Sequence, residues 1–212
     1  MAKRMPNLSD KNQVCVICEG DEEYDYLETL KSLNVWSEKY EILPDNAKGN
    51  GNISARYQDR YQNGSYDIVL VFCDTEKKPY KQYDKIKEKI NEFHGDEDTA
   101  DEVIIYSNPC TMQIILSHWD EVHLKSPSKT VNAPLIEKLT GVANYKGRDD
   151  QRKKIMEQIT FENYWYMRRR IDELENMDTK TGSSNFGRFM KFFEEDNDQW
   201  IKDINCKLEQ EL

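Results

Sequence analysis

The stretch QVCVICEGDEE, residues 13–23, decides the fold that we expect for this chain. The apolar run from Val14 to Cys18 has the length of a buried strand, and Glu19-Gly20-Asp21 ends it. From Glu22 to about Leu33, large apolar side chains recur at intervals of three and four residues, which is the spacing of one helix face. The stretch therefore predicts a strand, a turn and a helix in that order.

The same order recurs farther along the chain. Ile68 to Cys73 is an apolar run without alternation, which suits a central parallel strand covered on both faces. It ends at Asp74-Thr75-Glu76, after which the pattern predicts a charged amphipathic helix. Further strands are expected at residues 40–43 and 102–106, helices at 53–61 and 80–94, and a mobile loop at 44–52. The alternation predicts an α/β protein with a largely parallel four-stranded sheet and helices on both faces.

The character of the chain changes near residue 125. Before it, Ser107 or Asn108 is expected to cap a helix that carries Pro109 in its first turn. From Ser126 onward no strand-like run is visible. Helices are expected at residues 132–139, 148–177, 185–194 and 198–208, with a break near Phe161 left open. We therefore expect an α/β domain over residues 1–125 and a helical extension packed on it over residues 126–212.

Composition limits the class of protein. Of the 212 residues, 37% are hydrophobic and 33% charged, and 4 Trp, 12 Tyr and 7 Phe supply the buried surface that a disordered chain lacks. No apolar run approaches the roughly 20 residues that cross a bilayer, so we expect a cytoplasmic protein without a membrane partner.

The five cysteines, an odd number, do not suggest a disulfide framework in a chain of this length. Cys15 and Cys18 form a C-x-x-C, but residues three apart in a strand point to opposite faces. Two buried thiols are therefore a better interpretation than a zinc or redox site.

The net charge of −10 is unevenly distributed. Residues 121–170 hold 11 Lys and Arg against 6 Asp and Glu, and the segments on either side are acidic. Neutralisation of phosphates drives most nonspecific nucleic-acid binding, so this segment favours a nucleic-acid partner; a solvated helix surface explains the charges equally well. The basic side chains considered are Lys125, Lys129, Lys146, Arg148, Arg152, Lys153, Lys154, Arg168, Arg169 and Arg170.

Acidic residues follow two of the expected strands. Glu19 follows the first strand directly, Glu23 lies four residues later, and Asp74 and Glu76 follow the central strand. Ligands of open parallel sheets bind beyond the carboxyl ends of the strands, where these four carboxylates would converge. Such a cluster holds protons or a divalent cation, and oxygen ligands with room for water and phosphate favour Mg²⁺ or Mn²⁺. The alternative is that the acids complement a helix dipole or lie in solvent.

Three short blocks, at residues 16–23, 71–76 and 107–119, carry a resemblance to a known family. The first, V-I-C-E-G-D-E-E, is similar to the strand-Glu-Gly opening of Toprim domains, and the second, V-F-C-D-T-E, stands where those domains have D-x-D. The third holds S-N-P-C, I-I-L and H-W in the order of the S-N-P-C-F-E-x-W-L-L-x-H-[FW] segment of RloB-like proteins. Tyr145-Lys146 resembles a short motif downstream in the same proteins, so the resemblance covers residues 13–147.

The resemblance implies a Toprim-like, Rossmann-like fold and a Mg²⁺-dependent nuclease in bacterial anti-phage defence, with RNA, such as transfer RNA, favoured over DNA. It implies that Glu19 is a general acid/base or metal-adjacent residue and that Asp74 is the principal metal ligand. Two positions depart from the family: Glu76 is the second acid of D-x-D, and Met112 stands where the family has an acid. Met112 favours the alternative function, a noncatalytic nucleic-acid-binding or regulatory module of a defence complex.

Two further side chains are candidates for catalysis. His118 could act as an acid or phosphate donor, although a core histidine beside Ile115 and Trp119 explains it equally well. Lys146 could bind a scissile phosphate, with a solvent-facing lysine as the alternative. The chain has no G-x-x-x-x-G-K-[ST] motif, so ATP hydrolysis would need a separate partner, and a homodimer is left open.

An aromatic group precedes the run Arg168-Arg169-Arg170. Its members could stack on bases, but burial in a helix core is the interpretation that we favour from the sequence. The group consists of Phe161, Tyr164, Trp165 and Tyr166.

Overall fold

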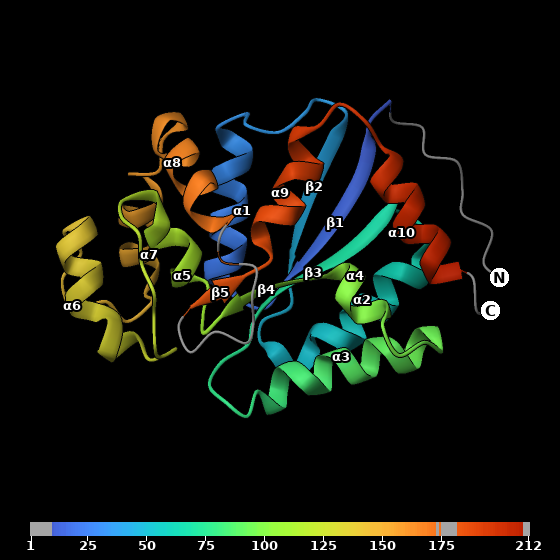
Figure 1. The fold of residues 1–212 in the computed structure, drawn as a ribbon, viewed down its shortest axis with the longest axis horizontal. Helices are drawn as coiled ribbons and strands as arrows, with labels where there is room; N and C mark the ends of the chain where they lie inside the picture. The colour runs from blue at the N-terminus through green and yellow to red at the C-terminus, as the bar shows by residue number, and fades with distance from the viewer. Residues whose placement is uncertain (1–9, 173, 175–181, 210–212) are drawn as a thin grey trace.

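A five-stranded sheet lies at the centre of the computed structural model, which describes residues 10–172, 174 and 182–209 (Figure 1). The strands are β1 (Asn12–Cys18), β2 (Tyr40–Asn46), β3 (Ile68–Asp74), β4 (Ile104–Asn108) and β5 (Ser183–Ser184), in the spatial order β2-β1-β3-β4-β5. The first four are parallel, and β5 is antiparallel to β4. The expected α/β class and parallel four-stranded core are confirmed.

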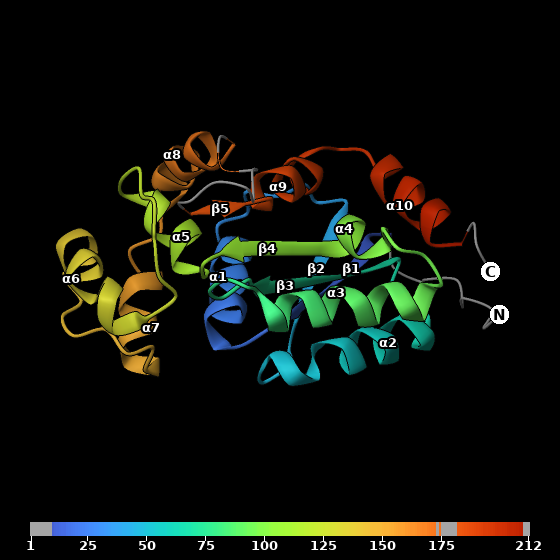
Figure 2. The same ribbon diagram turned by 60° about the horizontal axis from the view of Figure 1, so that its bottom comes forward.

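Helices cover both faces of the sheet (Figure 2). The crossover helix α1 (Asp21–Ser32) lies on one face, and α2 (Ile53–Asn63) and α3 (Lys81–His94) lie together on the other. The C-terminal helix α9 (Phe186–Glu194) shares the face of α1, because the Phe186 ring lies 5.7 Å from the ring of Tyr26 in α1. These packed apolar surfaces hold the strand ends in fixed positions.

Of the remaining helical elements, α5 to α8 are grouped beside α1, whereas α4 and α10 lie toward the other end of the sheet (Figure 1). They are α4 (Thr99–Val103), α5 (Met112–Ile115), α6 (Lys129–Thr140), α7 (Asp149–Met156), α8 (Phe161–Ile171), α10 (Gln199–Glu209) and the short 3-10 turns η1 (Asn50–Asn52) and η2 (Leu116–His118). The break near Phe161 separates α7 from α8, and residues 175–177 of the expected long helix lie outside the described residues. None of the helices in the described part of the chain has the length and apolar character needed to cross a membrane.

Strand β5 corrects the expectation that no strand follows Ser126. Ser183 pairs with Asn108 and Ser184 with Ser107, so the C-terminal part of the chain contributes an edge to the sheet. Ser107 and Asn108 therefore belong to a strand instead of capping a helix, and the next helix begins at Met112. Two serines have no apolar periodicity that could have indicated a strand.

Strand β2 is longer than expected, because it continues through Pro44 to Asn46. It is an edge strand, where a proline without an N–H can be accommodated. The segment that follows is tied to the end of β1: Ala47 N donates to Cys18 O at 2.9 Å and Gly49 N to Glu19 O at 2.7 Å. Most of the expected mobile loop is thus strand or hydrogen-bonded turn beside Glu19.

Candidate functional site

Glu19 and Asp74 lie at the point where the sheet changes direction. The strand order places β2 on one side of β1 and β3 on the other, which opens a crevice beyond the carboxyl ends of β1 and β3. Glu19 directly follows β1, and Asp74 is the last residue of β3. The Asp74 backbone N–H donates to Glu19 Oε2 at 3.0 Å, so the structure brings these two predicted site residues into contact.

Thr111 links Asp74 to Glu23. Its backbone N–H donates to Asp74 Oδ1 at 2.7 Å, and its hydroxyl lies 2.8 Å from the same oxygen and 2.5 Å from Glu23 Oε1. Because a hydroxyl has one proton, it can donate to only one of the two carboxyl groups and must accept from the other. In the metal-free protein, this contact therefore favours a protonated carboxyl group at Asp74 or Glu23.

Glu23 also organises the start of α1. Its Oε2 accepts a hydrogen bond of 2.9 Å from the Gly20 backbone N–H, which closes the first turn of the helix. The side chain is buried, with 4% exposed, and both of its oxygens have hydrogen-bond partners. Glu23 is therefore held behind Glu19 and Asp74 and adds its charge to theirs.

A cavity of about 270 Å³ opens onto these carboxyl groups. It is lined by Glu19, Glu23, Asp74 and Glu76, all four of the predicted metal ligands, and by Lys129 and Arg152 from the helical extension. Glu76 is held in the left-handed region, with a φ of 63°, and its backbone N–H donates to Pro109 O at 3.1 Å. The structure thus gathers the four predicted acids around one hollow.

The carboxyl groups are held close enough to hinder one another's ionisation. Burial, together with the charges of Glu23 and Glu76, raises the pKa of Glu19 to about 7. Burial and the charges of Glu23 and Glu19 raise the pKa of Asp74 well above its ordinary value, and burial and Glu22 raise the pKa of Glu23. Clustered carboxyl groups of this kind hold protons until a cation replaces them.

The four acids at the cavity differ from other acids on α1 in whether they have a basic partner. Among the described residues, no Lys, Arg or His lies within 4.0 Å of the carboxylates of Glu19, Glu23, Asp74 or Glu76. By contrast, the three other acids in the first turns of α1 each have a basic partner: Asp21 pairs with Lys48, Glu22 with Lys129 and Asp25 with Arg152. The ion pairs neutralise the charges of the second group, whereas no described cation neutralises those of the first, although Glu23 also closes the first turn of α1.

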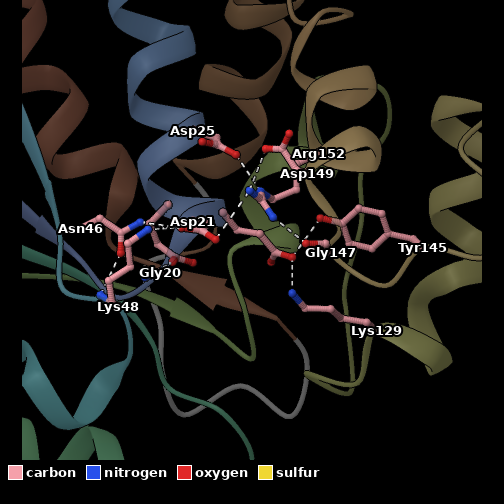
Figure 3. Close-up of polar contacts among 12 residues, drawn as sticks. Gly20, Asp21, Asp25, Asn46, Lys48, Lys129, Tyr145, Gly147, Asp149 and Arg152 are labelled. Atoms are coloured by element: carbon pink, nitrogen blue, oxygen red, sulfur yellow. Dashed lines mark hydrogen bonds and ion pairs between the residues drawn. The ribbon is translucent and has the colours of Figure 1, made fainter.

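The paired acids hold the helical extension against α1 (Figure 3). Arg152, whose side chain is 9% exposed, donates to Asp25 Oδ2 at 2.6 Å and to Gly147 O at 2.6 Å. Lys129 and the Tyr145 hydroxyl both donate to Glu22 Oε1. Gly147 has a φ of 73°, and a Cβ at this position would collide with Lys129 Nζ. The backbone is therefore shaped to admit the lysine at the cavity wall.

Sequence reasoning did not single out Thr111 or Glu22, noted Tyr145 only as part of a short family motif, and placed Lys129 and Arg152 only in a general basic segment. Their roles depend on contacts between α1 and residues about 90 to 130 positions later in the chain. Thr111 could have been noticed because it follows the Asn-Pro-Cys block.

His118 and Lys146 are not brought to the carboxylates. His118 is 1% exposed, and its ring nitrogens lie 2.9 Å from the Tyr26 hydroxyl and 3.0 Å from Asn163 Oδ1. Burial lowers the pKa of His118 to about 4. Lys146 is exposed and does not line the cavity. The core-histidine and solvent-lysine interpretations therefore describe these two positions.

His118 should make the fold sensitive to acid. The unfolded chain takes up a proton near pH 6.5, whereas the folded histidine, with a pKa near 4, does not, so the free energy of unfolding falls as pH decreases between these values. We expect His118 to contribute a loss on the order of 1–2 kcal/mol between pH 7.5 and pH 5. Urea unfolding at both pH values should show a smaller loss in His118→Gln. The exposed His123 provides the control, and an unchanged loss in His118→Gln would contradict this assignment.

The donor set suits a hard cation such as Mg²⁺ or Mn²⁺. Thr111 bonds only to Oδ1 of Asp74, and the Asp74 backbone N–H bonds only to Oε2 of Glu19. The second oxygen of each carboxyl group takes no part in these bonds and could bind a cation. Within the described residues, no three His, Cys, Asp or Glu side chains form a ready-made metal cluster. Mg²⁺ does not require one, because it is commonly held by one or two carboxylates together with water and substrate phosphate. That all four predicted ligands share a cation stays a prediction.

Fold and site together define an α/β protein with an acidic crevice at the switch point of a mostly parallel sheet. Compared with protein-family models, curated proteins and solved structures, the chain gives no match. The functional assignment therefore depends on the residues of the site.

Proposed function

We propose that this protein is a metal-dependent nuclease that cleaves phosphodiester bonds at the Glu19–Asp74 crevice, with RNA as the favoured substrate. The observation that carries the proposal is the group of four carboxylates gathered at the carboxyl ends of β1 and β3, which have no basic partner within the described part of the chain. Such a group destabilises the metal-free fold, because like charges repel and burial opposes ionisation. A divalent cation would relieve that cost and so account for the arrangement.

Glu19 and Asp74 would be the principal ligands, with Glu76 beside them and Glu23 behind. When bound, Mg²⁺ supplies a Lewis acid for a phosphate oxygen and lowers the pKa of a coordinated water. The chain itself orients Asp74 through Thr111 and Glu23 through Gly20. In the metal-free protein the Glu19 carboxyl group, with a pKa of about 7, holds or releases a proton near neutral pH, so binding of a cation there would be coupled to loss of that proton.

Lys129 would contact the phosphate on the other wall of the cavity. Its side chain is 45% exposed, and its ammonium group bonds to a single described carboxylate, that of Glu22. Arg152, in contrast, already donates to Asp25, Gly147 and Asp149 and has little capacity for a ligand. Lys129 is thus the cation that this site can offer to a substrate.

Replacement of Lys129 by Gln should lower kcat/KM for nucleic-acid cleavage by roughly tenfold or more, because a charge-assisted hydrogen bond to phosphate is lost. Lys146→Gln is the matched control, since Lys146 is exposed and lies outside the cavity. Cleavage rates and melting temperatures of both variants should be compared. Equal rates for Lys129→Gln and wild type would remove Lys129 from the site.

The Toprim and RloB-like character, and a role in anti-phage defence with a separate ATPase or other defence partner, belong to the same proposal. The positions of Glu19 and Asp74 at the ends of adjacent parallel strands support the Toprim-like part, and the defence role and its partner follow from the sequence resemblance alone.

The noncatalytic nucleic-acid-binding module is the second candidate. Met112, which stands where the family has an acid, is 2% exposed and lines the cavity with an apolar surface. Met112 therefore supplies no oxygen ligand for a second cation on this side of the cavity.

Incubation of the pure protein with labelled total RNA and with plasmid DNA, in Mg²⁺, Mn²⁺ or EDTA, distinguishes the two functions. The nuclease proposal expects cleavage with a divalent cation and none with EDTA. Binding without cleavage under every condition would favour the noncatalytic module.

A further inference from the structure

Helix α8 carries an apolar surface that the fold does not use. Its inner side is occupied by Tyr164, Met167, Arg168 and Ile171, all of which are buried. Its outer side exposes Phe161, Trp165 and Tyr166 by 57%, 43% and 41%. Among the described residues, the only other large hydrophobic side chain in this exposed class is Val131. Three of the four exposed large hydrophobic side chains therefore lie on one helix.

The outer aromatic side chains form two groups on the exposed side of the helix, Phe161 with Trp165 and Tyr166 with two arginines. Phe161 and Trp165 are one helical turn apart, with ring centroids separated by 6.1 Å and an interplanar angle of 78°. The guanidinium group of Arg169 lies 5.1 Å from the centroid of the Tyr166 ring, and that of Arg170 lies 5.8 Å from it. We call Phe161, Trp165, Tyr166 and Arg169 the α8 platform.

The charge of this helix face is positive. Arg168 is neutralised inside the fold by Glu194 and Asp172, whereas Arg169 is exposed. Arg170 is anchored by donation to Ser117 O at 2.7 Å, which holds its charge beside the platform. Glu162 is the acid on the exposed side of the helix, so the cations of this face outnumber its anions.

We propose that the α8 platform binds single-stranded nucleic acid, with bases stacked on its aromatic rings and phosphates next to its arginines. Every base has a π face, and an aromatic surface with adjacent arginines is the arrangement that proteins use for single strands. In a duplex the bases are already stacked on one another, so the aromatic rings have little to contact. We further infer that the bound strand is the substrate of the nuclease. This second step rests on the proposed function, whereas the binding itself does not.

Charge complementarity favours this occupant over an apolar protein surface. A purely apolar partner would bury the arginines next to the rings without pairing their charges. The phosphates of a nucleic acid pair with those charges directly. In the sequence, the platform lies within residues 121–170, which hold 11 Lys and Arg against 6 Asp and Glu.

The test is fluorescence anisotropy of a labelled single-stranded RNA 12-mer in EDTA, where metal-dependent cleavage does not interfere. Trp165→Ala should weaken binding about tenfold, the effect typical of losing one base stack. Arg169→Ala should weaken it and also reduce its salt dependence. Val131→Ala, at a side chain 64% exposed on α6, is the matched control for removing an exposed hydrophobic group and should bind as wild type does. Circular dichroism and melting temperature check that each variant is folded.

Three results would overturn the platform. The first is unchanged affinity in both Trp165→Ala and Arg169→Ala, and the second is equal affinity for double-stranded and single-stranded RNA. The third is a platform variant whose apparent mass in sedimentation equilibrium differs from that of wild type while its RNA affinity is unchanged. That result would assign the surface to contact with a second copy of the chain. If Trp165→Ala is poorly folded, quenching of wild-type tryptophan fluorescence by the 12-mer and the Arg169→Ala result decide the question.

These results are independent of the nuclease proposal. Platform variants that retain affinity, with a wild-type protein that cuts, would remove the platform and leave the nuclease. Lost affinity in the variants, with a wild-type protein that never cuts, would leave the platform and remove the nuclease.

Discussion

Replacement of Glu19 by Gln is expected to reduce metal-dependent cleavage by roughly 100-fold or more, without loss of stability in the metal-free protein. The substitution keeps the shape of the side chain and removes a charge that would hold the cation and exchange a proton, a contribution of about this size. In the metal-free fold, the same change relieves the burial of a charge and its repulsion by Glu23. The free energy of unfolding should therefore stay the same or rise by about 1 kcal/mol.

The pH dependence of this stabilisation has a definite sign. With a folded pKa of about 7 and an ordinary value of 4.5, Glu19 binds its proton more tightly in the folded state than in the unfolded chain. Its contribution to stability is present below pH 4.5 and is lost as pH rises towards 7. The advantage of Glu19→Gln over wild type should therefore grow over the same interval.

Melting temperatures without metal and cleavage rates with Mg²⁺, measured on the same preparations, test this prediction. Glu28→Gln, on the exposed part of α1, is the control and should change neither quantity. A Glu19→Gln variant that melts far below wild type would make Glu19 a structural acid. One that cuts at the wild-type rate would place the chemistry elsewhere.

Arg168→Ala is expected to lower the free energy of unfolding by about 3–5 kcal/mol, the usual cost of breaking a buried ion pair. The Arg168 side chain is 8% exposed and donates to Glu194 Oε1 at 2.7 Å and to Asp172 Oδ1 at 3.0 Å. Its removal leaves Glu194, which is 17% exposed, without this cation. Arg169→Ala should change stability little, because Arg169 is exposed.

Urea unfolding of Arg168→Ala and Arg169→Ala compares the free energies of unfolding of the two variants. It also separates the three arginines that the sequence placed together as possible phosphate contacts. Arg168 is paired with Asp172 and Glu194 inside the fold, so a substitution of all three arginines would disrupt folding as well as any binding. Equal stability of Arg168→Ala and wild type would show that the pair with Glu194 contributes nothing.

The sheet and the acids at its edge could be predicted because their signals are local. Val14 to Cys18 and Ile68 to Cys73 are apolar runs long enough to be strands, and an acid follows each one directly. The carboxyl ends of adjacent parallel strands meet at one edge, so strand assignment brought Glu19 and Asp74 together on the condition that the two strands are neighbours, as β1 and β3 are.

The features that sequence reasoning missed depend on distant contacts or on weak patterns. Strand β5 consists of two serines, and it forms because β4 offers an edge about 75 residues earlier in the chain. The position of Lys129 at the cavity depends on Glu22, and the burial of Arg168 depends on Glu194. The aromatic group of α8 was predicted to be core, but the helix buries Tyr164 and exposes Phe161, Trp165 and Tyr166. A pattern with aromatic residues on both faces does not indicate which face is covered.

The most direct test of the central claim, that the carboxylates at the ends of β1 and β3 form a cation site, is a titration with Mn²⁺ followed by electron paramagnetic resonance. We expect saturable binding to wild type, much weaker binding to Asp74→Asn, and wild-type binding to Asp21→Asn, whose carboxylate is already paired with Lys48. No saturable binding to wild type, or equal binding to wild type and Asp74→Asn, would contradict it.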